Sequence, residues 1–596
     1  MKKFIFPVLA IVLLSACGGN QETAQSNSLA PNINPRFDSY KNNFIEALWK
    51  VYPTWASSQG YHKYDSILVV PDEASRAKEL AFVKANLDSL KTFDINGLSD
   101  NNKTDYYMIE NQLKSIEWGI NELKAYEWNP ADYNVSGSFA EILNGNYDSL
   151  DVRLRNFNLK MANIGAYYEA AKKNIKNPTL VHTELAIDQN LGGVSVFEKD
   201  FHEALNKVRF GEHEKQMMEA NARMAVKAIK DYADWLKKLK NPTPRSFRLG
   251  KELYAKKFEY DIQSGYTAEQ IYEKALARKK ELHEKMFEIA DKLWDKYVGK
   301  ENTNIKPTDR LQLIKQVIDK ISEKHVQPDS FQTAIEKQLP VLTEFIKKKD
   351  LITMDPTKPL VVRREPDYMA GVAGASISAP GPYDKNGNTY YNVGSLSGWP
   401  KDKAESYLRE YNHYILQILN IHEAIPGHYT QLVYSNQSPS LIKALFGNNA
   451  MIEGWAVYTE RMMLENGYDD SPEMWLMYYK WNLRSTCNTI LDYSVHTKDM
   501  SQEDALNLLI NEAFQQQAEA EGKWKRVSVT QVQLCCYFTG YTEIYDFREE
   551  LKKQMNDKFN LKLFHEQFLS YGSAPVKYIR QLMLKEMEKC PAFKQN

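Results

Sequence analysis

The chain has 596 residues, of which 76 are Lys or Arg and 77 are Asp or Glu, so its formal net charge is −1. This near-neutral balance argues against a nucleic-acid-binding protein, because such proteins usually carry a basic excess. Hydrophobic residues at 43% and charged residues at 26% exclude a globally disordered or collagen-like chain. Five cysteines are too few for a disulfide scaffold of this length.

The N-terminus has the layout of an exported bacterial lipoprotein. A short basic start precedes an apolar run at 4–14, which is too short for a typical membrane-spanning helix. Leu-Ser-Ala-Cys, ending at Cys17, resembles the lipoprotein box and implies a signal peptide over 1–16, lipid on the Cys17 thiol and a flexible tether over 17–34. We expect attachment to the cell envelope, in the outer membrane because Gly18 rather than Asp follows the cysteine. The alternative is a plain signal peptide with an incidental cysteine.

Most of the remaining chain has the pattern of amphipathic helices, with apolar residues at spacings of three and four between charged ones. Thr267 and Ser501 are each followed by acidic residues and predict capped helix starts. We expect a mostly α-helical protein with an N-terminal helical half over 35–350 and a second, catalytic half over 351–596. The clearest helical segments are 74–92, 103–126, 198–240, 267–298, 310–322 and 328–348.

Residues 351–400 break the helical pattern, since they are rich in Gly, Pro and Ser. The segments 360–362 and 389–393 are typical of short strands, and the Asn-Gly pair within 385–388 is a hairpin-type turn signal. We therefore expect a small β-sheet here, with helices resuming from about residue 402.

The candidate chemistry concentrates in the run from His422 to His428, which follows a strongly apolar helical stretch. Imidazoles and a carboxylate beside such a stretch are costly unless they are paired or metal-bound. The HExxH spacing is absent, and residues six apart on a straight helix lie about 120° from a common face. Pro426 has no N–H, and its ring clashes with the carbonyl of His422. We expect a widened or kinked turn there, eased by Gly427, that brings His428 beside His422.

A third candidate ligand is Glu453, which lies 25 residues after His428 in a predicted helix. Two histidines and one glutamate leave one zinc position open for water, which is the arrangement of a catalytic rather than a structural site. Glu423, next to His422, could take a proton from that water. The sequence therefore predicts one zinc ion per chain, although cobalt or manganese could occupy the same ligands. The alternative is a solvated glutamate with ordinary core histidines.

Other polar residues occur in apolar helices nearby. Arg484, Asp492 and His496 are separated by eight and four residues, so they could share one helix face. They could support the metal ligands or stabilise an oxyanion, and a structural salt bridge with a capping histidine is an equal alternative. Tyr537 is a candidate phenol donor, and Glu460 is a candidate support for the metal ligands.

The segment 422–431, HEAIPGHYTQ, resembles the HExxPGHxxQ signature of a bacterial family catalogued as domain of unknown function 885. The likeness extends over most of the mature chain. It includes Glu453-Gly454-Trp455-Ala456, the spaced Arg484, Asp492 and His496, the set Gln533, Tyr537, Gly540 and Arg548, and the closing Phe564, His565, Leu569, Gly572 and Pro575.

The resemblance implies a large helical zinc-peptidase-like fold of the gluzincin type, similar to thimet oligopeptidase and carboxypeptidase Taq, with a small β-sheet near the active site. It also implies the roles of single residues. These are zinc ligation by His422, His428 and Glu453, a general base at Glu423, and stabilisation of the tetrahedral intermediate by Tyr537 or His496.

The expected function is a lipid-anchored zinc metallopeptidase that acts on a peptide substrate. We expect the sheet near Tyr390 and Asn392 to hold an extended peptide by strand addition. The alternative is a non-catalytic helical surface lipoprotein that binds peptides or glycans. The sequence leaves open the substrate, the choice between internal and terminal cleavage, and the oligomeric state.

Overall fold

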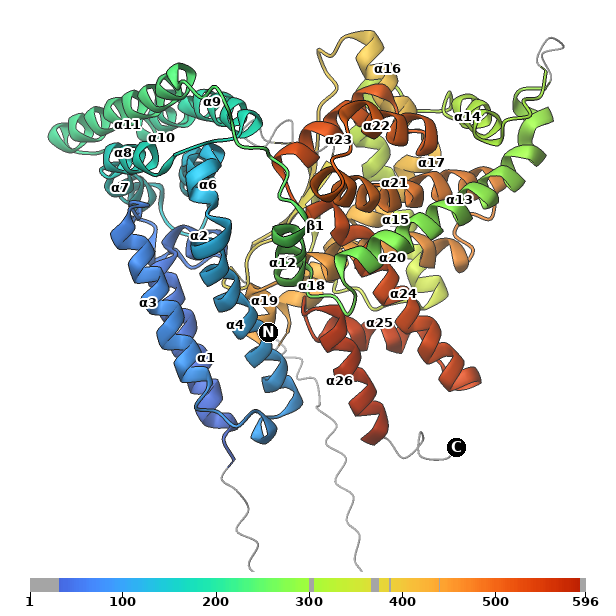
Figure 1. The fold of residues 1–596 in the computed structure, drawn as a ribbon, viewed down its shortest axis with the longest axis horizontal. Helices are drawn as coiled ribbons and strands as arrows, with labels where there is room; N and C mark the ends of the chain where they lie inside the picture. Colours follow the sequence, from blue (N-terminus) through green and yellow to red (C-terminus); the bar gives the residue numbers. More distant parts are fainter. Residues whose placement is uncertain (1–31, 300–304, 366–374, 385–386, 439, 590–596) are drawn as a thin grey trace, which may run out of the picture.

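The computed structural model describes residues 32–299, 305–365, 375–384, 387–438 and 440–589. The described chain is mostly helical with one small three-stranded sheet, as the sequence predicted (Figure 1). Cys17, the predicted signal peptide and most of the predicted tether lie outside the described residues. Of the described helices, none is both long enough and apolar enough to cross a bilayer.

The helices fall into three runs along the chain. The first run is α1 (Asn34–Val51), α2 (Pro53–Ser58), α3 (Glu73–Leu90), α4 (Asp100–Trp118) and α5 (Ala125–Trp128). The second is α6 (Ser136–Asn144), α7 (Leu150–Met161), α8 (Ile164–Asn174), α9 (Leu180–Ser195), α10 (Phe201–Leu205) and α11 (Glu212–Lys238). The third begins with α12 (Lys251–Ile262), α13 (Ala268–Tyr297), α14 (Arg310–Ile321) and α15 (Phe331–Lys349).

After the sheet, the third run continues to the C-terminus. Its helices are α16 (Lys401–Glu410), α17 (His413–Glu423), α18 (His428–Asn436), α19 (Leu441–Leu445), α20 (Asn449–Glu465), α21 (Pro472–Thr497), α22 (Gln502–Asn507), α23 (Gln517–Val529), α24 (Cys536–Met555), α25 (Leu561–Ser570) and α26 (Val576–Lys589).

These runs pack around two hydrophobic cores. The main core joins side chains from 37–128 with side chains from 249–583, so the first helices pack with the last ones. The second core is built from 133–236 together with Leu68, and its helices form the arm at the upper left of Figure 1. The cores therefore divide the chain near residues 130 and 240, whereas the sequence predicted two halves that meet at 350.

The sequence signals explain several element boundaries. Thr267 and Gln270 form a reciprocal capping box at the start of α13, and the Ser501 side chain accepts a hydrogen bond from the Asp504 amide at the start of α22. The predicted segment 198–240 is interrupted, because the chain leaves the helix after Leu205 and α11 begins only beyond Gly211.

The sheet has the strand order β1-β3-β2, with β1 (Leu360–Arg364), β2 (Ala375–Ser378) and β3 (Thr389–Val393). The central strand β3 is parallel to β1 and antiparallel to β2. Strands β1 and β3 were predicted, and β2 was not. The Tyr391 hydroxyl donates a hydrogen bond to Asn420 of α17 at 2.7 Å, which fixes the sheet beside the helix that carries His422.

Two glycines allow α20 and α24 to pack backbone against backbone. A Cβ atom on Gly454 would lie 2.4 Å from the Cα of Gly540, and one on Gly540 would lie 1.6 Å from the Ala450 carbonyl oxygen. Only glycine fits such an approach. The crossing brings the helix of Glu453 directly against the helix of Tyr537.

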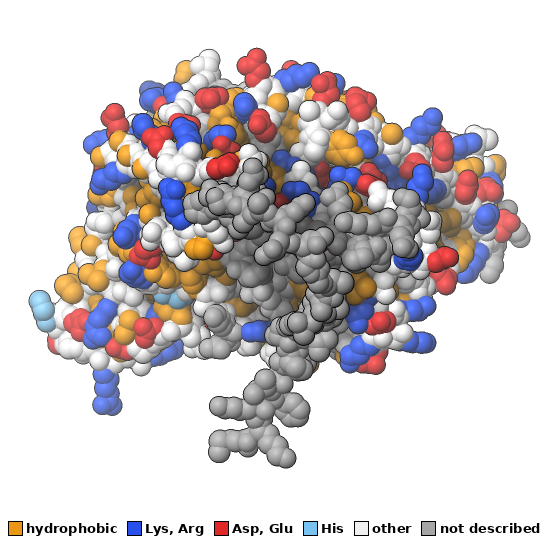
Figure 2. Space-filling view, turned by 90° about the horizontal axis from the view of Figure 1, so that it is seen from below, with side chains coloured by type: hydrophobic (Ala, Val, Ile, Leu, Met, Phe, Trp, Pro, Cys, Tyr) orange, Lys and Arg blue, Asp and Glu red, His pale blue; other side chains and the backbone are white. Residues whose placement is uncertain are grey.

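The described surface agrees with the near-neutral composition. Basic and acidic side chains are interspersed over the described part of the face seen in Figure 2.

Candidate metal centre

One helix ends and another begins between the two candidate histidines. α17 ends at Glu423 and α18 begins at His428, with a cis peptide bond between Ile425 and Pro426. A Cβ atom on Gly427 would lie 1.8 Å from the carbonyl oxygen of His422, so this turn requires glycine. The sequence predicted a kinked or widened helix. The structure instead has two helices, and the turn between them brings the two imidazoles together.

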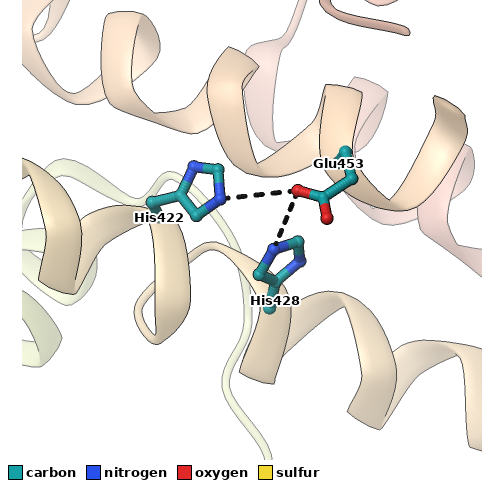
Figure 3. A group of neighbouring side chains, drawn as sticks. All are labelled: His422, His428 and Glu453. Carbon is teal, nitrogen blue, oxygen red and sulfur yellow. Dashed lines mark ion pairs between the residues drawn. The ribbon is translucent and has the colours of Figure 1, made fainter. Parts of the chain in front are cut away.

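His422, His428 and Glu453 converge on one point (Figure 3). The imidazole centroids are 4.8 Å apart, and the Glu453 Oε2 atom lies 3.6 Å from Nε2 of His422 and 3.3 Å from Nε2 of His428. Ligand atoms of a tetrahedral zinc site, at bond lengths of about 2.0–2.1 Å, are about 3.3 Å apart. The Oε2 atom of Glu453 is buried and has no hydrogen-bond partner among the described residues. These residues therefore fit a divalent cation.

Electrostatics hold the three groups in this arrangement. Burial would lower the pKa of His422, but the carboxylates of Glu453 and Glu460 outweigh burial and raise that pKa to about 10. Burial would raise the pKa of Glu453, but His428 and His422 outweigh it and hold that pKa well below its usual range. At neutral pH an ionised carboxylate therefore faces a protonated His422, whose proton a zinc ion would replace on binding. Two histidines and one glutamate are the donor set of a zinc site that has one open position.

Glu460 supports the first histidine from behind. Its Oε1 atom lies 2.7 Å from Nδ1 of His422 and accepts a hydrogen bond from the Trp481 indole N–H at 2.9 Å. Glu460 is fully buried. A carboxylate on one imidazole nitrogen fixes the ring orientation and the tautomer, so that the other nitrogen is presented as a ligand. Glu460 thus lies where the sequence analysis expected support for the ligands.

A cavity of about 1440 Å³ opens onto the three residues, and Glu423 lines it beside them. Burial raises the pKa of Glu423, while the nearby imidazoles of His428 and His422 act in the opposite direction. No described residue donates a hydrogen bond to the carboxylate of Glu423. Side chains from α9, from β2 and from α23 form the other walls of the cavity.

The sequence matches the family described as "Bacterial protein of unknown function (DUF885)" over residues 53–583. The chain belongs to the DUF885 family. The family membership expected from the HExxPGHxxQ resemblance is thereby confirmed.

Two solved structures are similar to this DUF885 chain. A "putative lipoprotein of unknown function" from Shewanella oneidensis is 56% identical, with a TM-score of 0.83 over 92% of this chain and 99% of its own. A "putative lipoprotein" from Colwellia psychrerythraea is 15% identical and shares the fold, with a TM-score of 0.75 over 93% of this chain and 99% of its own. A search of curated proteins found no match.

Tyr537 of this DUF885 protein lines the cavity at the start of α24. Its hydroxyl accepts a hydrogen bond from Nη2 of Arg526 at 3.3 Å, and the same nitrogen donates to Oε1 of Gln533 at 2.7 Å. Because the guanidinium occupies an oxygen lone pair, the phenolic hydrogen is available for donation into the cavity. Burial and the charge of Glu453 raise the pKa of Tyr537, so the phenol remains protonated at neutral pH.

Arg526 was missed by sequence reasoning. It is one of 76 basic residues, and it follows Lys523 and Lys525 on a helix whose charges are typical of a solvated face. Only the fold shows that this face borders the cavity.

Asp492 braces the turn that precedes α24. Its carboxylate accepts hydrogen bonds from the amides of Val532 and Leu534, at 3.0 and 2.9 Å, and from the Tyr254 hydroxyl at 3.0 Å. Val532 has a φ of 70°, a conformation that is strained for a β-branched residue. Asp492 therefore supports the position of Tyr537 rather than that of the metal ligands.

His496 does not take the predicted place beside a reacting oxygen. It is not among the residues that line the cavity, and its Nε2–H faces the carbonyl oxygens of Val527 and Thr530 at 3.0 and 3.1 Å. Its nitrogen is therefore engaged in joining α21 to the end of α23. The expectation that His496 steadies an intermediate is corrected.

Arg484 lines the cavity but is not part of a network with Asp492. Its Nη2 atom lies 2.5 Å from Oε1 of Glu519, and its guanidinium packs over the ring of Trp481 at 4.7 Å. The residues that were predicted to share a helix face thus have separate partners.

Tyr390 and Asn392 lie on the central strand β3, which is paired on both sides. Asn392 is fully buried and bonds to Arg363 and Ser378, and Tyr390 packs against the same arginine. A strand with two partners has no edge for another strand, so the predicted peptide contact at these two residues is corrected. The strand whose residues line the cavity is β2, which pairs only with β3 among the described strands.

Proposed function

We propose that this DUF885 protein is a zinc-dependent metallopeptidase of the gluzincin type. The observation that carries the proposal is the convergence of His422, His428 and Glu453 on the wall of a large cavity, with the carboxylate of Glu423 beside them. The first three residues would hold the ion and leave one position open. A zinc ion, when bound, supplies a Lewis acid that polarises a carbonyl group and lowers the pKa of water.

The chain's own residues supply the remaining chemistry. Glu423 accepts a proton from the attacking water and returns it to the leaving amine. Tyr537 donates its phenolic hydrogen to the carbonyl oxygen as that atom gains charge. Strand β2 offers an extended peptide a strand edge at the cavity wall.

A lipid anchor on Cys17 completes the proposal. The lipoprotein box of the sequence supports it, and both similar structures are described as lipoproteins. The anchor would hold the enzyme on the cell envelope, at the outer membrane.

Metal analysis and digestion of a peptide library test the function together. Purified protein is expected to hold about one zinc ion per chain. His422→Ala should lose the metal and the activity. Glu423→Gln should keep the metal and lose at least about 100-fold in hydrolysis, because it removes only the base.

Two variants outside the cavity serve as matched controls for Glu423→Gln and His422→Ala. Glu203→Gln and His213→Ala change exposed residues outside the cavity and should alter neither quantity. A metal-free protein, together with a Glu423→Gln variant that behaves like wild type, would favour a non-catalytic binding lipoprotein instead.

A further inference from the structure

The cavity wall formed by α23 carries a surplus of positive charge. Lys523 and Arg526 of this helix line the cavity together with Arg484 and Glu519. Glu519 is shared, because its Oε1 atom lies 2.5 Å from the guanidinium of Arg484 and 3.7 Å from the Lys523 ammonium. Three of the lining cations thus share one nearby carboxylate, so positive charge is in excess at this part of the wall.

The acidic side chains of the opposite wall do not pair with these cations. Glu184 and Asp188 of α9 line the same cavity, but their carboxylates form no ion pair with the three cations. Asp132 also lines the cavity and forms no ion pair with these cations, and the buried Glu410 nearby is paired with Lys480 at 2.9 Å.

Arg526 is the cation closest to the candidate chemistry. No carboxylate of a described residue lies within ion-pair distance of it, and Gln533 and Tyr537 hold its Nη2 atom in place. The charge of Glu453 acts on it from a distance, but that carboxylate faces the two imidazoles. A guanidinium presents a planar fork of donors that matches a carboxylate. An oriented arginine without an acidic partner is therefore suited to an anionic ligand.

Lys523 also lacks a full counter-charge. Only 5% of its surface is exposed, and burial, with the positive charge of Arg484, lowers its pKa to about 7. A buried ammonium is costly unless an anion is paired with it. An anion in the cavity would stabilise the charged form of Lys523 as well as pairing with Arg526.

We propose that Arg526, with Lys523 and Arg484 behind it, binds a carboxylate of the peptide substrate. This inference rests on the proposed peptidase function and names the substrate class. The carboxylate is either the C-terminal one or an Asp or Glu side chain. Because Arg526 contacts Tyr537, the ligand lies beside the reacting centre. If the carboxylate is C-terminal, cleavage falls close to the end of the peptide.

Binding to the Glu423→Gln protein tests this site without turnover. The probes are alanine-rich pentapeptides with one Leu or Phe, each prepared as a free acid and as a C-terminal amide, and titrated by calorimetry. We expect the free acids to bind at least about tenfold more tightly than the amides, as loss of a charge-assisted hydrogen bond predicts. An amide with Glu as its last residue separates the two sources, because it recovers binding only if a side-chain carboxylate is accepted.

Variants of Arg526 assign the effect to this residue. In the Glu423→Gln background, Arg526→Gln should reduce the ratio of acid to amide affinity to about one. Arg526→Lys should keep part of that ratio, because it keeps the charge and loses the fork. Lys553→Gln removes an exposed cation of α24 far from the cavity lining and should leave the ratio unchanged.

The possible failures are distinguishable. The carboxylate site would be overturned if acids and amides bound equally well, or if neither bound detectably. It would also be overturned if the ratio of acid to amide affinity were unchanged in an Arg526→Gln protein of normal thermal stability. Hydrolysis of acids and amides at equal rates by the wild type would also overturn it, while leaving the peptidase function intact. Preferential binding of acids without hydrolysis by the wild type would reject the peptidase function and retain the site.

Discussion

The Nδ1 atom of His422 lies 2.7 Å from the buried carboxylate of Glu460, and this contact points the Nε2 atom of His422 at Glu453. The pairing connects two helices of the site, since His422 lies in the last turn of α17 and Glu460 lies on α20, the helix that carries Glu453. A carboxylate behind an imidazole orients the ring and strengthens it as a ligand.

Glu460→Gln should therefore weaken zinc binding about 10- to 100-fold, because the neutral amide orients the ring less firmly. Competition with a chromophoric chelator measures this affinity. Glu521→Gln, an exposed change on α23, is the control. An unchanged zinc affinity in Glu460→Gln would show that the contact does not support a metal ligand.

Gly427→Ala should disrupt the turn between α17 and α18. The new Cβ atom would lie 1.8 Å from the His422 carbonyl oxygen, so the backbone must move and separate the two histidines. We expect loss of bound zinc and a decrease of about 3 kcal/mol in the free energy of unfolding. Metal content and urea denaturation provide the two readouts.

Gly192→Ala is the matched control, because nothing lies within 4 Å of a Cβ atom at this exposed position of α9. It should keep the metal and raise the free energy of unfolding by about 0.5–1 kcal/mol. Normal zinc binding by Gly427→Ala would refute the steric explanation of the turn.

Asp492→Asn should impair catalysis without removing the metal. The amide offers one acceptor where the carboxylate accepts from both Val532 and Leu534, so the strained turn before Tyr537 loses support. We expect a loss of about 1–3 kcal/mol in the free energy of unfolding. A lower kcat with full zinc content is the expected pattern, and loss of zinc would show that Asp492 acts on the ligands instead.

His565 predicts a decline in stability on mild acidification. Burial, with the positive charge of Arg548, lowers its pKa to about 4, while its Nδ1–H donates to the Leu351 carbonyl and its Nε2 accepts from Tyr458. The unfolded chain binds a proton near the ordinary histidine pKa of about 6.5, above the folded value. Stability from this group is therefore complete above pH 6.5 and is lost as the pH falls toward 4.

Between pH 7 and pH 5, this linkage amounts to about 2 kcal/mol in the free energy of unfolding. Denaturant titrations at the two pH values measure it. His565→Gln should be less stable at pH 7 but should lose about 2 kcal/mol less between the two pH values. An identical decline in both proteins would assign the acid sensitivity to other groups.

The helical framework and the convergence of His422 with His428 could be predicted from sequence because their signals are local. Amphipathic spacing and the capping residue Thr267 define α13, and the pairing of Pro426 with Gly427 indicated that the helix could not continue unchanged. Both follow from the chemistry of the residues themselves.

The wrong and missing predictions concern residues whose structure or role depends on neighbours that are distant in the sequence. The spacing of Asp492 and His496 could not show that both contact backbone of the 527–534 segment. Strand β2, with the sequence Ala-Ser-Ile-Ser, has little strand propensity and is held by its pairing with β3. Arg526 becomes a candidate functional residue only because the fold places it at the cavity.

The close crossing of α20 and α24 at Gly454 and Gly540 fixes the positions of Glu453 and Tyr537 relative to each other. Gly454 follows Glu453 directly, and Gly540 lies one helical turn after Tyr537, so the proposed carboxylate ligand and the proposed proton donor are held by one helix crossing. A side chain at either glycine would shift both groups at once. The cavity walls formed by α9, β2 and α23 are not part of this helix crossing. If the proposed function holds, substrate preference can therefore be changed by substitutions in these walls while the distance between Glu453 and Tyr537 stays the same.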